Sequence, residues 1–300
     1  MKLRRTTLFI AGTMPELQMR DIIATCGADL ICLDLEDTVL PARKAEARTT
    51  IVNLLNEDIW GRAARAVRIN AINSPFAADD VHAMVTGAFG RIDTLLLSKP
   101  ESVDEIHWLD AEVKRLAQPE EGQPNIGYLL GIESARALTD IDALAGASPN
   151  VEGLGLAIGD LSVSLGINIG AYLQDRSSYP GDLFHFHRAR LILAARAHGL
   201  WAMDAPWPII GDHAILAQDA RWGAMMGFDG KLVLAPEQVR TVHEAYRPTP
   251  AELNYARSVL ESLARLNESG EGAGVENGTF LDPVVMQPAL RTIARAEASL

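Results

Sequence analysis

The amino-acid sequence predicts an α/β protein, a (β/α)8 TIM barrel with a C-terminal helical extension. Short runs rich in leucine, isoleucine and valine recur eight times, and stretches with helical spacing of apolar residues alternate with them. Most of these runs are apolar at successive positions, which is typical of parallel strands buried on both faces. The 300 residues suffice for one barrel of about 250 residues and a tail. An open, doubly wound sheet is the alternative, because the linear pattern does not show closure.

Each expected strand is a short apolar run that ends at a loop. The expected strands are Thr6–Ala11, Asp29–Leu35, Arg65–Ile69, Asp93–Leu97, Gly127–Ile132, Gly153–Ile158, Leu200–Met203 and Lys231–Leu234. The expected helices are Pro15–Thr25, Arg43–Asn56, Ala77–Thr86, Val103–Leu116, Ala135–Leu144, Asp182–Ala197, His213–Met226 and Pro236–Ala245. Pro15 stands in a first turn, where a helix tolerates proline, and Ile51, Val52 and Leu55 fall on one side of the second helix.

The sequence changes character at Pro248, so we expect residues 1–247 to form a catalytic barrel and residues 248–300 an extension. A helix is expected from Thr249 to about Leu266, then a Gly- and Glu-rich link, a short segment at residues 279–282 and a last helix from Pro283. A tail of about fifty residues is too small to build a good core alone. We therefore expect it to pack on the barrel or on a neighbouring subunit.

The composition argues against several classes of partner. Lysine and arginine number 27 against 39 aspartates and glutamates, a net charge of −12, which disfavours nucleic acid and anionic membrane surfaces. No apolar run approaches the roughly 20 residues of a membrane helix or the length of a signal sequence, so we expect a cytoplasmic protein. Cys26 and Cys32 are the only cysteines and are expected to be ordinary buried thiols rather than a disulfide framework.

Polar residues gather where the expected strands end, which in a barrel is the edge that carries the active site. The residues at these ends are Asp34, Glu36, Asp37, Arg68, Asn70, Ser98, Lys99, Glu133, Asp160 and Asp204. Carboxylates packed together repel one another unless a cation lies among them, and an all-oxygen ligand set suits Mg²⁺. Taken singly, Asp37 and Asp160 have the alternative role of helix N-caps.

Two other motifs suggest competing chemistry. Lys99 at a strand end has the position of a Schiff-base lysine, but the surrounding acids favour metal-dependent chemistry. Residues 153–159 superficially resemble a glycine-rich dinucleotide fingerprint. Their glycines, however, fall inside an expected strand and not in a strand-to-helix turn, so a dinucleotide site is not expected.

Seven motifs stand in order along the chain. They are Leu33-Asp34-Leu35-Glu36-Asp37, Pro41 with Lys44 to Arg48, Val67-Arg68-Ile69-Asn70, Gly131-Ile132-Glu133-Ser134-Ala135, Gly159-Asp160-Leu161, Asp229-Gly230-Lys231, and Asn277 to Pro283. With them the sequence resembles the citrate lyase β-subunit/malyl-CoA lyase family of the HpcH/HpaI aldolase superfamily. Asp58–Arg62 and Asn73–Phe76 are most similar to its malyl-CoA lyase branch.

The resemblance implies a metal-dependent barrel lyase that breaks or forms a carbon–carbon bond of a β-hydroxyacyl-CoA such as malyl-, citramalyl- or citryl-CoA. It implies that Glu133 and Asp160 bind Mg²⁺, or Mn²⁺ in its place, and contact the substrate. Glu36 and Asp37 would hold metal-bound waters, and Arg68 would grip the substrate oxygens during catalysis. Asp282 matches the family's acid–base aspartate, which a neighbouring subunit supplies, and the family's usual assemblies are homotrimers and hexamers.

Two positions depart from the family pattern on the side used for CoA. Ala235 replaces a histidine, and Met14 replaces an arginine before Pro15. A CoA-independent class II aldolase acting on a free hydroxy-oxo acid therefore stays open. A malyl-CoA thioesterase is a further alternative, because it would keep the same metal site. A non-catalytic homologue is disfavoured, since the matched site residues are all present.

Overall fold

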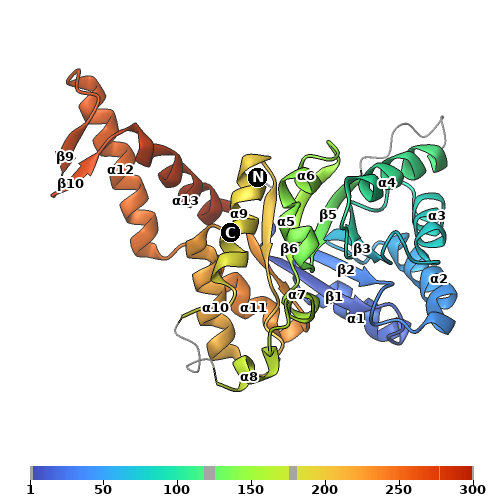
Figure 1. Ribbon diagram of the computed structural model, residues 1–300. Helices are drawn as coiled ribbons and strands as arrows, with labels where there is room; N and C mark the ends of the chain where they lie inside the picture. The colour runs from blue at the N-terminus through green and yellow to red at the C-terminus, as the bar shows by residue number, and fades with distance from the viewer. Residues whose placement is uncertain (1–2, 118–125, 176–180, 277, 299–300) are drawn as a thin grey trace. The chain divides into compact units, whose positions relative to one another are not determined.

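The computed structural model describes residues 3–117, 126–175, 181–276 and 278–298. Eight parallel strands form a closed barrel in sequence order (Figure 1). The strands are β1 (Thr6–Ala11), β2 (Leu30–Asp34), β3 (Ala64–Ile69), β4 (Thr94–Leu97), β5 (Gly127–Ile132), β6 (Val151–Leu156), β7 (Trp201–Asp204) and β8 (Gly230–Val233). Thr7 of β1 lies opposite Leu232 of β8, and this pairing closes the ring. The predicted barrel is thus confirmed and the open sheet is excluded.

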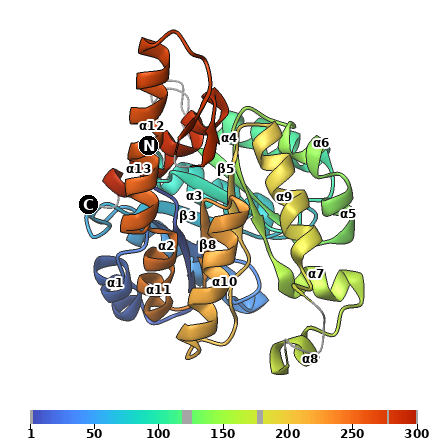
Figure 2. The same cartoon turned by 90° about the vertical axis from the view of Figure 1, so that its left-hand side faces the viewer.

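Helices surround the barrel and connect its strands. They are α1 (Glu16–Thr25), α2 (Lys44–Leu55), α3 (Ala77–Gly87), α4 (Val103–Leu116), α5 (Ala135–Thr139), α6 (Ile141–Ala145), α7 (Ile158–Leu165), α8 (Ile169–Gln174), α9 (His185–Ala197), α10 (His213–Met226) and α11 (Pro236–Tyr246). In Figure 2, α9 and α10 lie beside the strands, and they contact β7 and β8 respectively. At helix α4, the Ser102 and Glu105 side chains form a reciprocal capping box that fixes its first turn.

The helix predictions were wrong in three places. The single helix expected over residues 135–144 is two short helices, α5 and α6. Helix α9 begins at His185, three residues later than expected. Helices α7 and α8 were not predicted, and α7 begins where the sixth strand was expected to continue.

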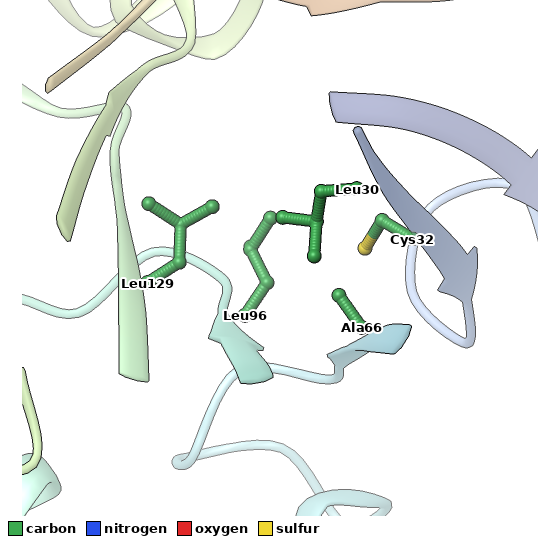
Figure 3. Close-up of a cluster of buried hydrophobic side chains, with 5 residues drawn as sticks. All are labelled: Leu30, Cys32, Ala66, Leu96 and Leu129. Carbon is green, nitrogen blue, oxygen red and sulfur yellow. The ribbon is translucent and has the colours of Figure 1, made fainter. Parts of the chain in front are cut away.

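Apolar side chains fill the inside of the barrel below its rim. Leu30 and Cys32 of β2 meet Ala66 of β3, Leu96 of β4 and Leu129 of β5, and each is at least 96% buried (Figure 3). The side chains of a strand alternate between its two faces, so Asp34 shares the inward face with Cys32, and Arg68 shares it with Ala66. The apolar layer therefore supports charged residues one step closer to the rim. Burial raises the pKa of the Cys32 thiol, as expected for an unreactive core cysteine.

The residues after Val242 form a second compact unit. It contains α12 (Pro250–Glu268), an antiparallel pair β9 (Gly274–Glu276) and β10 (Thr279–Leu281), a 3-10 turn η4 (Pro283–Val285) and α13 (Met286–Ala298). Its small core consists of Ala256, Val259, Leu263, Leu281 and Ala289. Helix α12 begins with a capping box between Thr249 and Glu252.

Among the helices of the described ranges, none combines the length and the apolar character needed to cross a bilayer.

Candidate active site

Five of the predicted site residues lie on the barrel edge formed by the C-terminal strand ends. Glu36 and Asp37 follow β2, Arg68 is the penultimate residue of β3, and Glu133 follows β5. Asp160 lies in the first turn of α7, because β6 ends at Leu156 and not at residue 158 as expected. The N-cap of α7 is residue 157, so the capping role considered for Asp160 is not found.

Lys99 connects these acids. Its Nζ lies 2.7 Å from Glu36 Oε1, 3.0 Å from Asp37 Oδ2 and 3.8 Å from Asp160 Oδ2. Its backbone N–H donates to Glu133 Oε1 at 3.1 Å. Lys99 has a φ of 53°, which is unusual for a residue with a side chain. In this backbone conformation its Nζ reaches the acids and its N–H reaches Glu133. Lys99 was expected at the strand ends and was considered for a Schiff base; its ion pairs with Glu36 and Asp37 instead leave its ammonium charged.

Arg68 is held in one orientation by two acids. Its Nε and Nη2 donate to the two carboxylate oxygens of Asp34 at 2.6 Å each, and its Nη1 lies 3.1 Å from Glu36 Oε2. Its guanidinium carbon is 5.1 Å from the centre of the Phe9 ring. A two-point contact of this kind fixes the guanidinium plane. Asp34 belongs to the first of the seven motifs, and the family resemblance implied no role for it. In the structure it is the residue that orients Arg68.

A buried network fixes the loop that carries Glu36 and Asp37. Lys44 Nζ donates to the carbonyl oxygens of Leu35 and Glu36 and to Asn70 Oδ1, at 2.8, 3.0 and 2.6 Å. Asn70 in turn donates its side-chain amide to Leu35 O and to Asp80. The motif residues Lys44 and Asn70 therefore hold the main chain behind the acids.

The charges of the site shift its pKa values in opposite directions. Burial alone would raise the pKa of Asp34, but hydrogen bonds from Arg68 lower it below the usual value. Burial raises the pKa of Glu36 despite the nearby Arg68 and Lys99. Burial also raises the pKa of Glu133 to about 8, and its neighbours Glu36 and Asp160 add to this effect. Glu133 is thus a buried carboxyl that a nearby cation would stabilise in its ionised form.

A small cavity of about 30 Å³ lies inside the barrel next to these residues. Arg68 and Glu133 provide its polar groups, and Phe9, Leu96, Leu129 and Leu232 provide apolar surface. A charged group on an apolar, concave floor is the arrangement expected of a small-molecule site.

The residues present fit a magnesium ion. In the described residues no three Asp, Glu, His or Cys side chains are grouped closely enough to enclose a metal. Magnesium does not need such a cage, because it is usually bound through one or two carboxylates, with water and substrate completing its octahedron. Glu133 and Asp160 lie within hydrogen-bonding reach of each other and provide that pair.

Asp204, expected at the same edge, belongs instead to a buried ion cluster. Its carboxylate receives Arg188 Nε at 2.9 Å and Lys231 Nζ at 3.0 Å, and both cations also contact Asp219. The prediction for Asp204 was therefore wrong. A lysine within an apolar strand needs a buried partner, and Lys231 was the available signal for this cluster.

Asp282 lies in the second unit, at the start of η4. Its Oδ1 accepts a hydrogen bond from the backbone N–H of Val284 at 3.0 Å, and the residue is half-buried. It belongs to a different compact unit from the barrel residues.

The chain is similar to named enzymes over almost its whole length. The family model described as HpcH/HpaI aldolase/citrate lyase matches residues 5–236. The L-malyl-CoA/beta-methylmalyl-CoA lyase of Cereibacter sphaeroides is 30% identical, over 98% of this chain and 94% of that protein. The citrate lyase subunit beta of Leuconostoc mesenteroides subsp. cremoris is 30% identical, over 99% of this chain and 95% of that protein.

Solved structures agree with this relationship. The crystal structure of the protein CitE from Mycobacterium tuberculosis, in complex with magnesium, acetoacetate and coenzyme A, has a TM-score of 0.77 at 27% identity and covers 98% of each chain. A citrate lyase from Burkholderia xenovorans LB400 has a TM-score of 0.86 at 20% identity, covers 100% of this chain and 93% of its own, and shows the same fold. The family predicted from the motifs is thereby confirmed: the chain belongs to the HpcH/HpaI aldolase/citrate lyase family.

Proposed function

We propose that this protein is a Mg²⁺-dependent lyase that cleaves or forms a carbon–carbon bond of a β-hydroxyacyl-CoA such as malyl-, citramalyl- or citryl-CoA. The observation that carries the proposal is the pair Glu133 and Asp160 beside Arg68, at the mouth of a barrel cavity. The names of the relatives, malyl-CoA lyase and citrate lyase subunit beta, support the class of reaction. The magnesium in the CitE complexes supports the metal.

In the cleavage direction the bond between C2 and C3 of the acyl chain breaks. The C3 hydroxyl loses its proton and becomes a carbonyl, and the bonding electron pair remains on C2 as an enolate of the thioester, which then takes up a proton. A magnesium ion held by Glu133 and Asp160 would offset the negative charge that develops on the substrate oxygens. Arg68, locked by Asp34, would donate hydrogen bonds to the same oxygens without reorganising. Glu36, Asp37 and the Lys99 ammonium would order water around the ion.

We propose Asp282 as the residue that exchanges a proton with C2, delivered from the second unit of a neighbouring subunit. The family resemblance of residues 277–283 supports this role. A shared site of this kind requires a homo-oligomer, and a trimer or hexamer is the assembly we propose. We also propose a cytoplasmic location, as expected from the sequence. Residues 1–247 are proposed as the catalytic barrel and residues 248–300 as the extension.

Replacing Glu133 by Gln or Asp160 by Asn removes charge but little volume from the metal site. We expect each variant to lose at least tenfold in Mg²⁺ affinity by calorimetry, together with cleavage of malyl-CoA followed as release of glyoxylate. Glu46→Gln is the matched control, because Glu46 is exposed on helix α2 and pairs with Arg43 of the same segment. Unchanged Mg²⁺ binding in both site variants would refute the assignment of the metal ligands.

A CoA-independent aldolase is the second candidate, favoured by Met14 and Ala235. Both follow neighbouring strands, β1 and β8, at the edge that carries the site. Quantifying the oxo acid and the free thiol that are released separates the candidates. The lyase releases glyoxylate, pyruvate or another oxo acid without free thiol, a thioesterase releases free CoA, and an aldolase acts on hydroxy-oxo acids that carry no CoA.

A further inference from the structure

Two glycines stand side by side in the wall of the barrel cavity. Gly131 of β5 pairs in register with Gly155 of β6, and both line the cavity. Barrel interiors of this kind are usually filled by bulky branched side chains. The cavity therefore exists because two neighbouring strands present no side chain at this level.

The surroundings of the two glycines differ. A Cβ at Gly131 would lie 2.7 Å from Glu133 Oε1, so glycine at 131 keeps the Glu133 carboxyl in place. A Cβ at Gly155 would meet nothing closer than Leu129 Cδ1 at 3.6 Å, and the φ of Gly155 is not positive. Neither backbone conformation nor packing requires glycine at 155, although glycine weakens a strand. A side chain at position 155 would fill part of the cavity.

The surroundings of that space are apolar at depth and charged at the mouth. A Cβ at Gly155 would lie 3.6 Å from Leu129 and 3.9 Å from Leu232, and the Phe9 ring completes the floor beneath Arg68. Figure 3 shows Leu129 extending inward from its strand beside Leu96. A ligand matched to this cavity has carboxylate or oxo oxygens at one end and a short alkyl group at the other.

We propose that Gly155 determines specificity, and that the space beside it receives an alkyl substituent on the hydroxyl-bearing carbon of the substrate. The proposal rests on the lyase function proposed above and names its substrate class. The preferred substrates are β-hydroxyacyl thioesters that release a 2-oxo acid with a methyl or ethyl group. Substrates that release glyoxylate would leave the space empty. Substrates that release a dicarboxylic oxo acid would place a carboxylate against leucine and phenylalanine side chains, where it lacks a partner.

The test compares the binding of glyoxylate, pyruvate, 2-oxobutyrate and oxaloacetate to Mg²⁺-loaded protein by calorimetry. Burying one methylene group is worth about fourfold in affinity, so we expect 2-oxobutyrate to bind more tightly than pyruvate by about that factor. Gly155→Ala should abolish this gain. Gly155→Val should weaken pyruvate and 2-oxobutyrate at least tenfold and leave glyoxylate within twofold of the wild type. Each Gly155 variant is compared with the wild type one ligand at a time, so that the hydration of that ligand in water cancels from the comparison.

Gly170→Ala is the matched control, because a Cβ there also meets its nearest neighbour at 3.6 Å, on helix α8 and outside the cavity lining. Equal weakening of all four ligands by Gly155→Val, a wild-type preference for oxaloacetate over 2-oxobutyrate, or no binding of any 2-oxo acid would overturn the proposal. If Gly155→Val does not fold, Gly155→Ala provides the test. This variant should bind 2-oxobutyrate no more tightly than pyruvate, and a retained preference for 2-oxobutyrate would overturn the proposal.

Carbon–carbon cleavage of β-hydroxyacyl thioesters by the same wild-type preparation, measured as release of the 2-oxo acid, keeps this proposal distinct from the lyase assignment. Alkyl discrimination without such cleavage of any of these thioesters would refute the lyase and support the subsite. Cleavage without alkyl discrimination would refute the subsite alone.

Discussion

At the scale of single residues, the site carries more negative than positive charge. Its five carboxylates, Asp34, Glu36, Asp37, Glu133 and Asp160, face the two cations Arg68 and Lys99, which leaves a formal charge of −3 when all are ionised. Coulomb repulsion inside a partly buried site is costly, and a divalent cation reduces that charge to −1. Without the ion, protonation of Glu133 is the available relief, which accounts for the direction of its pKa shift.

This charge balance predicts a pH-dependent stability difference for Glu133→Gln. The pKa of Glu133 rises from about 4.3 in the unfolded chain to about 8 in the native state. The stability associated with protonated Glu133 is therefore fully present below pH 4.3 and is lost as the pH rises towards 8. Glutamine does not titrate. In the absence of metal, the free energy of unfolding of Glu133→Gln should therefore rise relative to that of the wild type by up to about 1.4 kcal/mol per pH unit across that window.

Urea unfolding in a chelating buffer, at steps from pH 5 to 9, measures this difference. Glu46→Gln should show no change in its difference from the wild type above pH 5, because Glu46 is exposed and its pKa is lowered by hydrogen bonds from Arg43. If the difference in free energy of unfolding between Glu133→Gln and the wild type stays constant from pH 5 to 9, the pKa of Glu133 is not raised by burial.

At the scale of elements, four segments are tied together by buried charge. Arg188 of α9 and Lys231 of β8 share the carboxylates of Asp204, at the end of β7, and Asp219 of α10. Lys231 and Asp204 are completely buried. Removing one member of a buried ionic group leaves its partners unpaired, and this is more costly than losing a surface pair.

Lys231→Met should therefore destabilise the protein by about 3–5 kcal/mol, measured by chemical unfolding. Arg43→Met removes an exposed cation from its i,i+3 partner Glu46 and should produce no measurable change. A loss for Lys231→Met no larger than that of the control would show that the cluster does not hold these elements together.

The same elements show what could be predicted from the sequence. All eight strands were located to within two residues, because continuous apolar runs mark strands buried on both faces. The positions of Glu36, Arg68 and Glu133 followed from strand ends and motifs. Asp204 also lies at a strand end, but its ion pair with Arg188 did not follow from the sequence, because Arg188 is on a helix and nothing in linear spacing brings the two together. Helices α7 and α8 were missed because they are too short to show helical periodicity.

At the scale of the whole molecule, the proposed site needs residues from two chains. Asp282→Asn and Glu133→Gln should each be inactive as pure oligomers. Mixed, dissociated and reassembled, they should recover part of the activity, since some barrels would combine an intact Glu133 with an intact Asp282 from a neighbour. Activity is measured on reassembled oligomers whose size and mixed composition are verified by mass. No recovery despite verified mixing would remove Asp282 from a shared site.

The pairing of β1 with β8 also bears on the order in which the chain becomes a barrel during translation. At this seam Gly230 packs so closely on the chain entering β1 that a Cβ would lie 1.9 Å from the carbonyl oxygen of Arg4. Until residue 233 has left the ribosome, β1 has a free edge with unpaired amide and carbonyl groups, a template for association with another nascent chain. The ring can close only after β8, the last of its eight strands, has been made. The interval before closure is therefore when we expect this protein to depend most on chaperones.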